Sequence, residues 1–476
     1  MKKSIYIFFI SIFLLLLILV FKSIVFYSFS TRNIYNIVLI IFLILLILFL
    51  YKKNHIKLER IKFKYIFLIL IFLGIGLRLL LLLNTYNYPQ SDYQTFYENA
   101  IAVSTNIDDI NSRYISIFPH IGGYIVFLGN IFKLFGSSYN VYIITNIIFD
   151  LIGGIFLYKT LENLSSKKAG LIGLTIWMIC PINIIWCAFC SPVIIFNSLL
   201  NVAFFITSLI IKCDSNNKKK FLTLNLILGF SLGIANIFRP IMIIYIIAIF
   251  IYYLYILIFN NKNVLIYLFA FTLIFIPYFV VNNINNLSTT NLINEEITSN
   301  SVGWNLYIGS NISSRGMWYK EASILFREKS YNYSLSATDI QNYFMKLGLQ
   351  RYEDNGLDNL KLLDSKFNAF HERIGSYAYN SYFDILNIKN SNIINLMVML
   401  VTNSFYYLLV IISIFSFKTL YNDKNSKYLI CILFFMGVII SHLVMEASPR
   451  YMLPLLNVYI LISALWLNKY IKVKLD

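Results

Sequence analysis

Long runs of apolar residues recur from one end of the chain to the other, and short polar stretches separate them. Most of these thirteen runs approach or exceed the length of about 18 residues that crosses a bilayer as a helix. They cover residues 4–27, 34–51, 65–83, 120–136, 141–161, 169–187, 191–211, 221–238, 240–259, 264–281, 393–417, 428–445 and 451–467. The pattern predicts an all-α polytopic membrane protein.

Basic residues cluster in several of the polar stretches, as they do in cytoplasmic loops of membrane proteins. With the N-terminus inside, the third apolar run ends on the outer face. Counting back from an inside C-terminus places residues 282–392 on the outer face as well. Seven apolar runs lie between these two outer stretches, although an even number of crossings is needed.

The run 120–136 is the best candidate for a segment that does not cross. It is short, contains Gly122, Gly123, Gly129 and Lys133, and precedes a loop that has no basic residue. We therefore predict that it forms a surface helix on the outer face, which leaves about twelve transmembrane helices.

The predicted topology divides the chain into four parts. Residues 1–64 form an N-terminal transmembrane hairpin and a cytoplasmic loop, and residues 65–281 form a transmembrane core with a first outer loop at 84–140. Residues 282–392 form a mostly helical extracytoplasmic cap that carries half of the acidic residues. Residues 393–476 form the C-terminal transmembrane helices.

Composition excludes several other classes of protein. A hydrophobic content of 59% is too high for a water-soluble domain, and the net charge of +17 does not indicate nucleic-acid binding, because the lysines lie between apolar runs. The five cysteines are too scattered for a disulfide framework, and Cys187 and Cys190 fit small apolar residues at a helix end. His and Cys lack metal-ligand spacing, so neither a metal nor a cofactor is expected.

Asp92 is the most informative polar residue, because it follows the third apolar run in an acid-poor part of the chain on the predicted outer face. Tyr93 and other aromatic residues surround it, and Glu98 follows. A carboxylate among aromatic rings suits sugar binding, and it can take the proton of a hydroxyl group. The alternative interpretation is a solvated loop acid with tyrosines at the membrane interface.

Arg239 and Arg450 are two cationic residues on the same predicted face as Asp92. Arg239 precedes Pro240 between two apolar runs, where a charge is costly unless it is paired or faces water, and it could hold a lipid phosphate. His442, Glu446 and Arg450 are spaced i, i+4, i+8, which places them on one face if the helix is continuous. The alternatives are a snorkelling Arg239 and a structural pair of Glu446 with Arg450.

Further candidates lie in the outer loop and the cap. Arg113 and His120 flank Pro119, where a helix N-terminus could face an anion. Asn305 and Asn311 belong to an aromatic, glycine-containing stretch, which turn chemistry alone would also explain.

The chain resembles the membrane-embedded GT-C glycosyltransferases, specifically family 39, which includes protein O-mannosyltransferases and aminoarabinose transferases. The resemblance covers roughly residue 65 to the C-terminus, and the order of the motifs is its most specific feature. The matching motifs are Arg78-Leu79, Pro89-Gln90-Ser91-Asp92-Tyr93, Pro119-His120, Lys133-Leu134-Phe135-Gly136, Phe238-Arg239-Pro240, residues 305–311, and His442-x3-Glu446-x3-Arg450-Tyr451.

The resemblance implies a sugar transferred from a polyprenyl-phosphate carrier, such as undecaprenyl phosphate, to a glycan, lipid or protein of the cell envelope. It implies inversion at the anomeric centre, at the outer face of the cytoplasmic membrane. Asp92 would be the general base. Donor phosphate binding is assigned to Arg239, Arg450, Arg113 and His120, and substrate binding to Tyr93, Glu98, His442, Glu446, Tyr451, Asn305 and Asn311.

One departure from the family concerns a second acid. Many relatives have an acidic residue after the position of Pro181, where this chain has Ser191-Pro192, so Glu98 or Glu446 would have to replace it or none is needed. A transporter or flippase of lipid-linked sugars and a polysaccharide polymerase or ligase are the alternative functions. A transporter should carry charges in mid-span, and Asp150 is the main such charge here.

Overall fold

A computed structural model describes residues 2–30, 38, 40–42, 44–45, 56–61, 63–83, 89–106, 110–213, 217–260, 262–299, 301–372, 374–375, 377, 392–423 and 426–475. This part of the chain is almost entirely α-helical, so the predicted fold class is confirmed. The departure is a pair of short parallel strands, β1 (Ile56–Ile61) and β2 (Ile471–Leu475).

Eight helices in the described ranges are long and apolar enough to cross a membrane, so the chain is a multi-pass membrane protein. They are α1 (Lys2–Ser30), α3 (Phe63–Leu83), α7 (Tyr139–Leu164), α10 (Val193–Lys212), α11 (Lys218–Phe238), α12 (Met242–Asn260), α13 (Val264–Ile293), and α19 (Asn392–Phe415), which leads into α20 (Phe417–Tyr421). Two shorter helices, α21 (Leu429–Val444) and α22 (Leu455–Tyr470), pack among them. The number of twelve spans stays a prediction.

Two expected spans differ from the observed helices. The run 34–51 lies mostly outside the described residues. The run 169–187 is wrong as one continuous helix, because it is divided into α8 (Lys167–Met178) and α9 (Pro181–Trp186). Pro181 occupies the first turn of α9, where its missing N–H costs nothing, but it cannot continue α8.

The predicted surface helix is present as η1 (Pro119–Ile121) followed by α6 (Gly122–Phe135). Its 14 residues fall short of the about 20 that span a bilayer. It packs against α4 (Asp92–Thr105) and adjoins α5 (Ser112–Ile117). A placement on the membrane surface stays a prediction.

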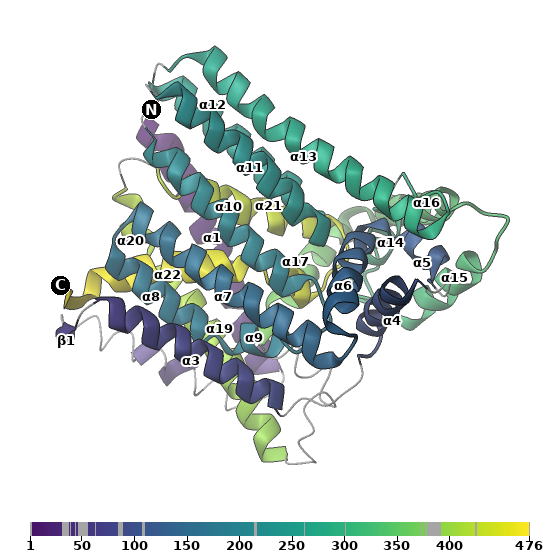
Figure 1. The fold of residues 1–476 in the computed structure, drawn as a ribbon, viewed down its shortest axis with the longest axis horizontal. Helices are drawn as coiled ribbons and strands as arrows, with labels where there is room; N and C mark the ends of the chain where they lie inside the picture. Colours follow the sequence, from purple (N-terminus) through teal and green to yellow (C-terminus); the bar gives the residue numbers. More distant parts are fainter. Residues whose placement is uncertain are drawn as a thin grey trace.

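The described residues of the cap region are mostly helical. Helix α13 continues beyond residue 281 to Ile293, and the boundary of the cap at residue 282 stays a prediction. The cap helices are α14 (Gly303–Gly309), α15 (Lys320–Ser330), α16 (Ala337–Asn355), η2 (Gly356–Asp358) and α17 (Asn359–His371). In Figure 1 α14, α15 and α16 gather with α4, α5 and α6 at one end, while both chain termini lie at the other.

Asp150, the apparent mid-span charge, is paired inside the helix bundle. Arg78 of α3 forms an ion pair with Asp150 of α7, and both side chains are fully buried. Arg78 also donates to the carbonyl of Met178 at 3.0 Å. A buried charge without a partner would be strongly destabilising, so this pair joins three helices and gives Asp150 a structural role.

Helix α17 connects the cap to two membrane helices. Ser23 of α1 donates to the Asn368 side chain at 2.7 Å, and the Nδ1 atom of His371 lies 3.0 Å from the Tyr406 hydroxyl of α19. His371 is fully buried, and burial lowers the pKa of its imidazole to about 3.

Acidification is therefore expected to destabilise the protein through His371. Between about pH 6.5 and 3 the unfolded histidine binds a proton that the folded one does not, so stability falls as the pH falls through this window. At pH 5 the cost is about 2 kcal/mol for this group. The thermal midpoint of wild type and His371→Gln should be compared at pH 7.5 and 5.0, and an equal loss in both proteins would contradict the prediction.

Candidate active site

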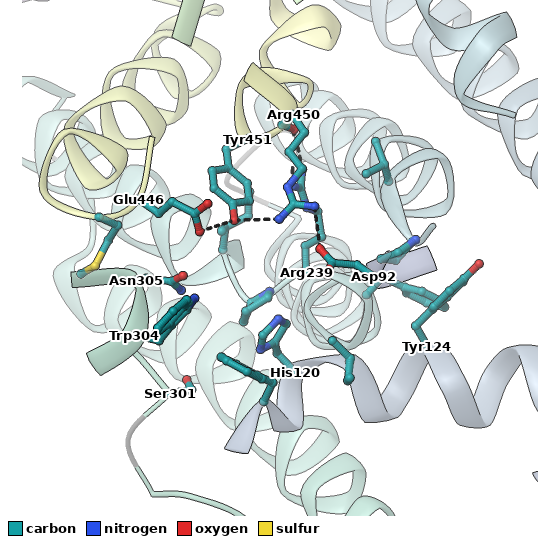
Figure 2. A pocket seen from close by; sticks show the side chains of 18 of the residues that line it. Asp92, His120, Tyr124, Arg239, Ser301, Trp304, Asn305, Glu446, Arg450 and Tyr451 are labelled. Atoms are coloured by element: carbon teal, nitrogen blue, oxygen red, sulfur yellow. Dashed lines mark hydrogen bonds and ion pairs between the residues drawn. The ribbon is translucent and has the colours of Figure 1, made fainter. Parts of the chain in front are cut away.

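A cavity of about 560 Å³ lies where the C-terminal ends of α11 and α21 meet the start of α12, the helices α4 and α6, and the cap. Figure 2 shows the side chains that face it. Six ionisable groups of acidic, basic or imidazole type line it: Asp92, His120, Arg239, His442, Glu446 and Arg450. Seven cap residues complete the wall: Ser301, Val302, Trp304, Asn305, Trp318, Ser323 and Phe326.

Asp92 is the first residue of α4, immediately after Ser91, whose φ of 55° marks a sharp turn into the helix. Arg450 lies in the short helix η4 (Pro449–Met452). Its Nη1 atom donates to the Asp92 carboxylate at 2.9 Å, and the Asp92 side chain remains 37% exposed. The arginine therefore orients the carboxylate while leaving part of it open to the cavity.

A hydrogen-bonded chain extends from this ion pair (Figure 2). The Arg450 Nη2 atom donates to the Tyr451 hydroxyl at 3.4 Å, and this hydroxyl donates to the Glu446 carboxylate at 3.0 Å. The His442 ring stacks on the Tyr451 ring with centroids 5.0 Å apart and an angle of 5°. Four of the sequence-predicted residues thus form one connected group with Asp92.

The predicted continuous helix face through His442, Glu446 and Arg450 is wrong. Helix α21 ends at Val444, and Met445 and Ser448 adopt extended backbone conformations. Pro449 cannot continue a helix from the preceding turn, so a separate 3-10 helix begins there. The three residues meet at the cavity because of this break, which turns Arg450 towards Asp92.

Arg239 ends α11 in an extended conformation, directly before Pro240. Its guanidinium contacts the carbonyl oxygen of Arg450 at 3.4 Å and lies over the Tyr451 ring, 5.7 Å from the centroid. No acidic side chain in the described part of the chain forms an ion pair with it. Burial lowers the pKa of Arg239 to about 10, so it remains a cation at neutral pH.

Burial also shifts the pKa values of two neighbours. It lowers the pKa of His120 to about 4, and the nearby charge of Arg239 acts in the same direction, so the imidazole is neutral at pH 7. Burial raises the pKa of Glu446 above its ordinary value, against the opposite effect of Arg450 and of the Tyr451 hydrogen bond. The cationic character of the cavity therefore comes from Arg239 and Arg450.

Three predicted site residues do not line the cavity. Arg113 donates to the backbone carbonyls of Ser330, Asn332 and Leu335, so its donors hold α5 to the cap. Glu98 points away on α4 and accepts a hydrogen bond from Gln94 at 2.9 Å. The Asn311 side chain accepts hydrogen bonds within its own turn, from Ser313.

Tyr93 and Asn305 do line the cavity, as predicted, although Tyr93 is almost fully buried. The sequence reasoning missed Tyr114 and Ser301 and gave Trp304 and Trp318 no role in the site. Two tryptophans within one polar segment were the available signal, because large aromatic residues exposed near a cavity often bind ligands.

Hydrogen bonds and a close packing contact hold the cap to the segment that carries Glu446. Tyr352 donates to the carbonyl of Val444 at 2.6 Å, and the N–H of Ala447 donates to the carbonyl of Gly316 at 2.7 Å. Gly309 packs so closely on this segment that an added Cβ atom would lie 2.6 Å from the carbonyl carbon and oxygen of Met445.

Gly309→Ala is therefore expected to push the cap away from the Glu446 segment and destabilise the protein by about 1–3 kcal/mol. Gly76→Ala is the matched control, because a Cβ atom there meets nothing within 4 Å. Thermal unfolding of the two variants and limited proteolysis of the cap measure the effect. Equal midpoints for both variants would show that the close contact does not constrain the cap.

Comparison with known proteins agrees with the sequence motifs. The model of the family described as dolichyl-phosphate-mannose-protein mannosyltransferase matches residues 121–282. This segment runs from α6 through most of α13 and includes Arg239. The resemblance to the GT-C membrane glycosyltransferases is thereby confirmed. A search of curated proteins finds none that matches the chain.

Two solved structures are similar over most of the chain. One is the oligosaccharyltransferase of Archaeoglobus fulgidus tethered with an acceptor peptide, at 11% identity and a TM-score of 0.43, covering 85% of this chain and 49% of that one. The other is ArnT from Cupriavidus metallidurans bound to undecaprenyl phosphate, at 10% identity and a TM-score of 0.34, covering 84% and 77%. The chain spans about half the length of the first of these.

Proposed function

We propose that this protein is a membrane glycosyltransferase that moves a sugar from a polyprenyl phosphate, such as undecaprenyl phosphate, to a hydroxyl group of a cell-envelope acceptor. The acceptor is a glycan, a lipid or a protein. One observation carries the proposal. A single cavity holds a carboxylate, Asp92, that is oriented by an arginine, and a second guanidinium, Arg239, that has no acidic partner among the described residues.

In the proposed reaction Asp92 accepts the proton of the acceptor hydroxyl as its oxygen attacks the anomeric carbon of the donor sugar. The bond from this carbon to the phosphate oxygen breaks, and the lipid phosphate leaves with the electron pair. Attack opposite to the leaving group inverts the anomeric centre. The departing phosphate is a weak base that needs no proton, so one carboxylate is sufficient.

The two arginines have different parts in this proposal. Arg450 is already committed to Asp92, and its hydrogen bond fixes the direction of the carboxylate. Arg239 is the cation that remains for the phosphate, where negative charge develops in the transition state. The neutral His120 ring next to it is suited to donating a hydrogen bond to a phosphate oxygen.

The position of the cavity supports an outward-facing site. Helix α11 begins at Lys218 within a lysine cluster and ends beside Arg239 in the cavity, so the two lie at opposite ends of one apolar span. Lysine clusters mark the cytoplasmic side of a membrane. The donor would therefore be bound at the outer face of the cytoplasmic membrane.

The cavity also has an apolar side that suits a lipid chain. Ile241, Ile243 and Ile244 at the start of α12 line it, and the Ile243 side chain is 42% exposed on the surface of the protein. A polyprenyl chain could lie along this side while its phosphate reaches Arg239.

Sugar transfer in proteoliposomes tests the function. Radiolabelled undecaprenyl-phosphate sugars are supplied with envelope extract as acceptor, and label is followed in the lipid and acceptor fractions. We expect label to move into the acceptor fraction and free undecaprenyl phosphate to inhibit the transfer. Label that crosses the bilayer while still attached to its lipid would indicate a flippase and would contradict the proposal. Chains of repeating units built on the lipid would indicate a polymerase.

A further inference from the structure

The cap contributes a wall to the cavity that contains no ionisable side chain. It consists of the seven residues from Ser301 to Phe326 that face the cavity, contributed by α14, α15 and the stretches before and between them. We call these residues the cap wall. The carboxylates, guanidinium groups and imidazoles of the cavity all belong to other parts of the chain. Figure 2 shows Ser301, Trp304 and Asn305 on the side away from Asp92.

Aromatic rings and short polar groups make up the cap wall, together with Val302. Trp304 is held in place, since its ring lies 4.9 Å from the Phe326 ring and 5.0 Å from the Phe344 ring, and its backbone N–H donates to the Gln341 side chain. Trp318 lines the same cavity and remains 59% exposed. A large aromatic side chain exposed at a cavity commonly marks a binding surface.

The chemistry of this wall limits what it can recognise. An anionic ligand would lack a cation on the wall, and a cationic ligand would lack a carboxylate. Asn305, Ser301 and Ser323 offer hydroxyl and amide groups that both donate and accept hydrogen bonds, as sugar hydroxyls require. The tryptophan faces match the apolar C–H faces of sugar rings. An extended peptide would instead favour an open strand edge, and the described cap residues form no strand.

We propose that the cap wall is the acceptor subsite and that it binds an uncharged carbohydrate, with Trp318 as its exposed stacking surface. This inference rests on the proposed function, because the charged side of the cavity is assigned there to the phosphate of the donor. It narrows the acceptor from glycan, lipid or protein to a neutral glycan, or to the neutral sugar portion of a larger molecule.

Binding measurements test the subsite without requiring turnover. The wild-type protein in nanodiscs is titrated by calorimetry with the neutral tetrasaccharides chitotetraose, cellotetraose and mannotetraose. Tetragalacturonic acid and a Ser/Thr-rich peptide serve as charged and peptide comparisons. We expect at least one neutral tetrasaccharide to bind, Trp318→Ala to weaken it about tenfold, and Trp318→Tyr to retain most of the affinity. Trp318 is exposed, so both variants should fold, which thermal unfolding checks.

Several outcomes would overturn the subsite. They are the absence of binding by every neutral tetrasaccharide, tighter binding of the acidic oligomer or the peptide, and equal binding by Trp318→Ala and wild type. Glu98→Gln, a change outside the cavity, should bind the tetrasaccharide as the wild type does. Binding that persists while sugar transfer is absent in the proteoliposome assay would retain the subsite and reject the proposed reaction, so the two proposals fail separately.

Discussion

Asp92→Asn is expected to lower the turnover of sugar transfer by about 1,000-fold, within the range of about 10²–10⁴ that positioned general bases contribute. The amide has nearly the shape of the carboxylate but cannot accept the proton of the acceptor hydroxyl. The loss should appear in kcat, because Asp92 is proposed to act on the reacting oxygen. Initial rates at saturating donor, with wild type and variant reconstituted at equal density, measure it.

Stability should change little in this variant. The ion pair with Arg450 is partly exposed, and such pairs contribute about 1 kcal/mol or less. Glu98→Gln is the matched control, because it is the same chemical change on the same helix and Glu98 lies outside the cavity. Glu98→Gln should retain transfer within about twofold of the wild type. Asp92→Asn activity above a tenth of the wild type would remove Asp92 as the base.

Arg239→Gln has the second largest expected effect, a loss of about 100–1,000-fold in kcat. Glutamine keeps a hydrogen-bond donor near the leaving phosphate but removes the positive charge. Arg450 is the other arginine that lines the cavity, and it could take the place of Arg239 only by leaving Asp92. Inhibition by free undecaprenyl phosphate should weaken in parallel, and kinetics with that inhibitor measure both effects.

Arg113→Gln is the control that shows whether the lost positive charge must lie in the cavity to affect phosphate binding. Arg113 donates to three backbone carbonyls of the cap and does not line the cavity. Its replacement should lower the thermal midpoint while folded protein retains its affinity for undecaprenyl phosphate. If Arg113→Gln weakens that affinity and Arg239→Gln does not, the assignment of the phosphate site is reversed.

The sequence alone determined the fold class and several elements of the cavity. Long apolar runs predict membrane helices because a bilayer leaves the backbone no other partners than its own. Asp92 and Arg239 were recognisable since each follows such a run, at a helix start or directly before a proline. A helix start and a position directly before a proline are determined by residues that are neighbours in the sequence. A local sequence pattern is therefore sufficient to identify them.

Contacts between distant segments were decided only by the tertiary structure. Arg450 and Asp92 are 358 positions apart, and their pairing depends on the break after Val444 that turns Arg450 into the cavity. Arg113 has the same charge and the same hydrogen-bond donors as Arg239, yet it donates to three backbone carbonyls of the cap. The charge of a side chain follows directly from the sequence. Its partner depends on how helices that are remote in the sequence pack together, and no local pattern encodes that packing.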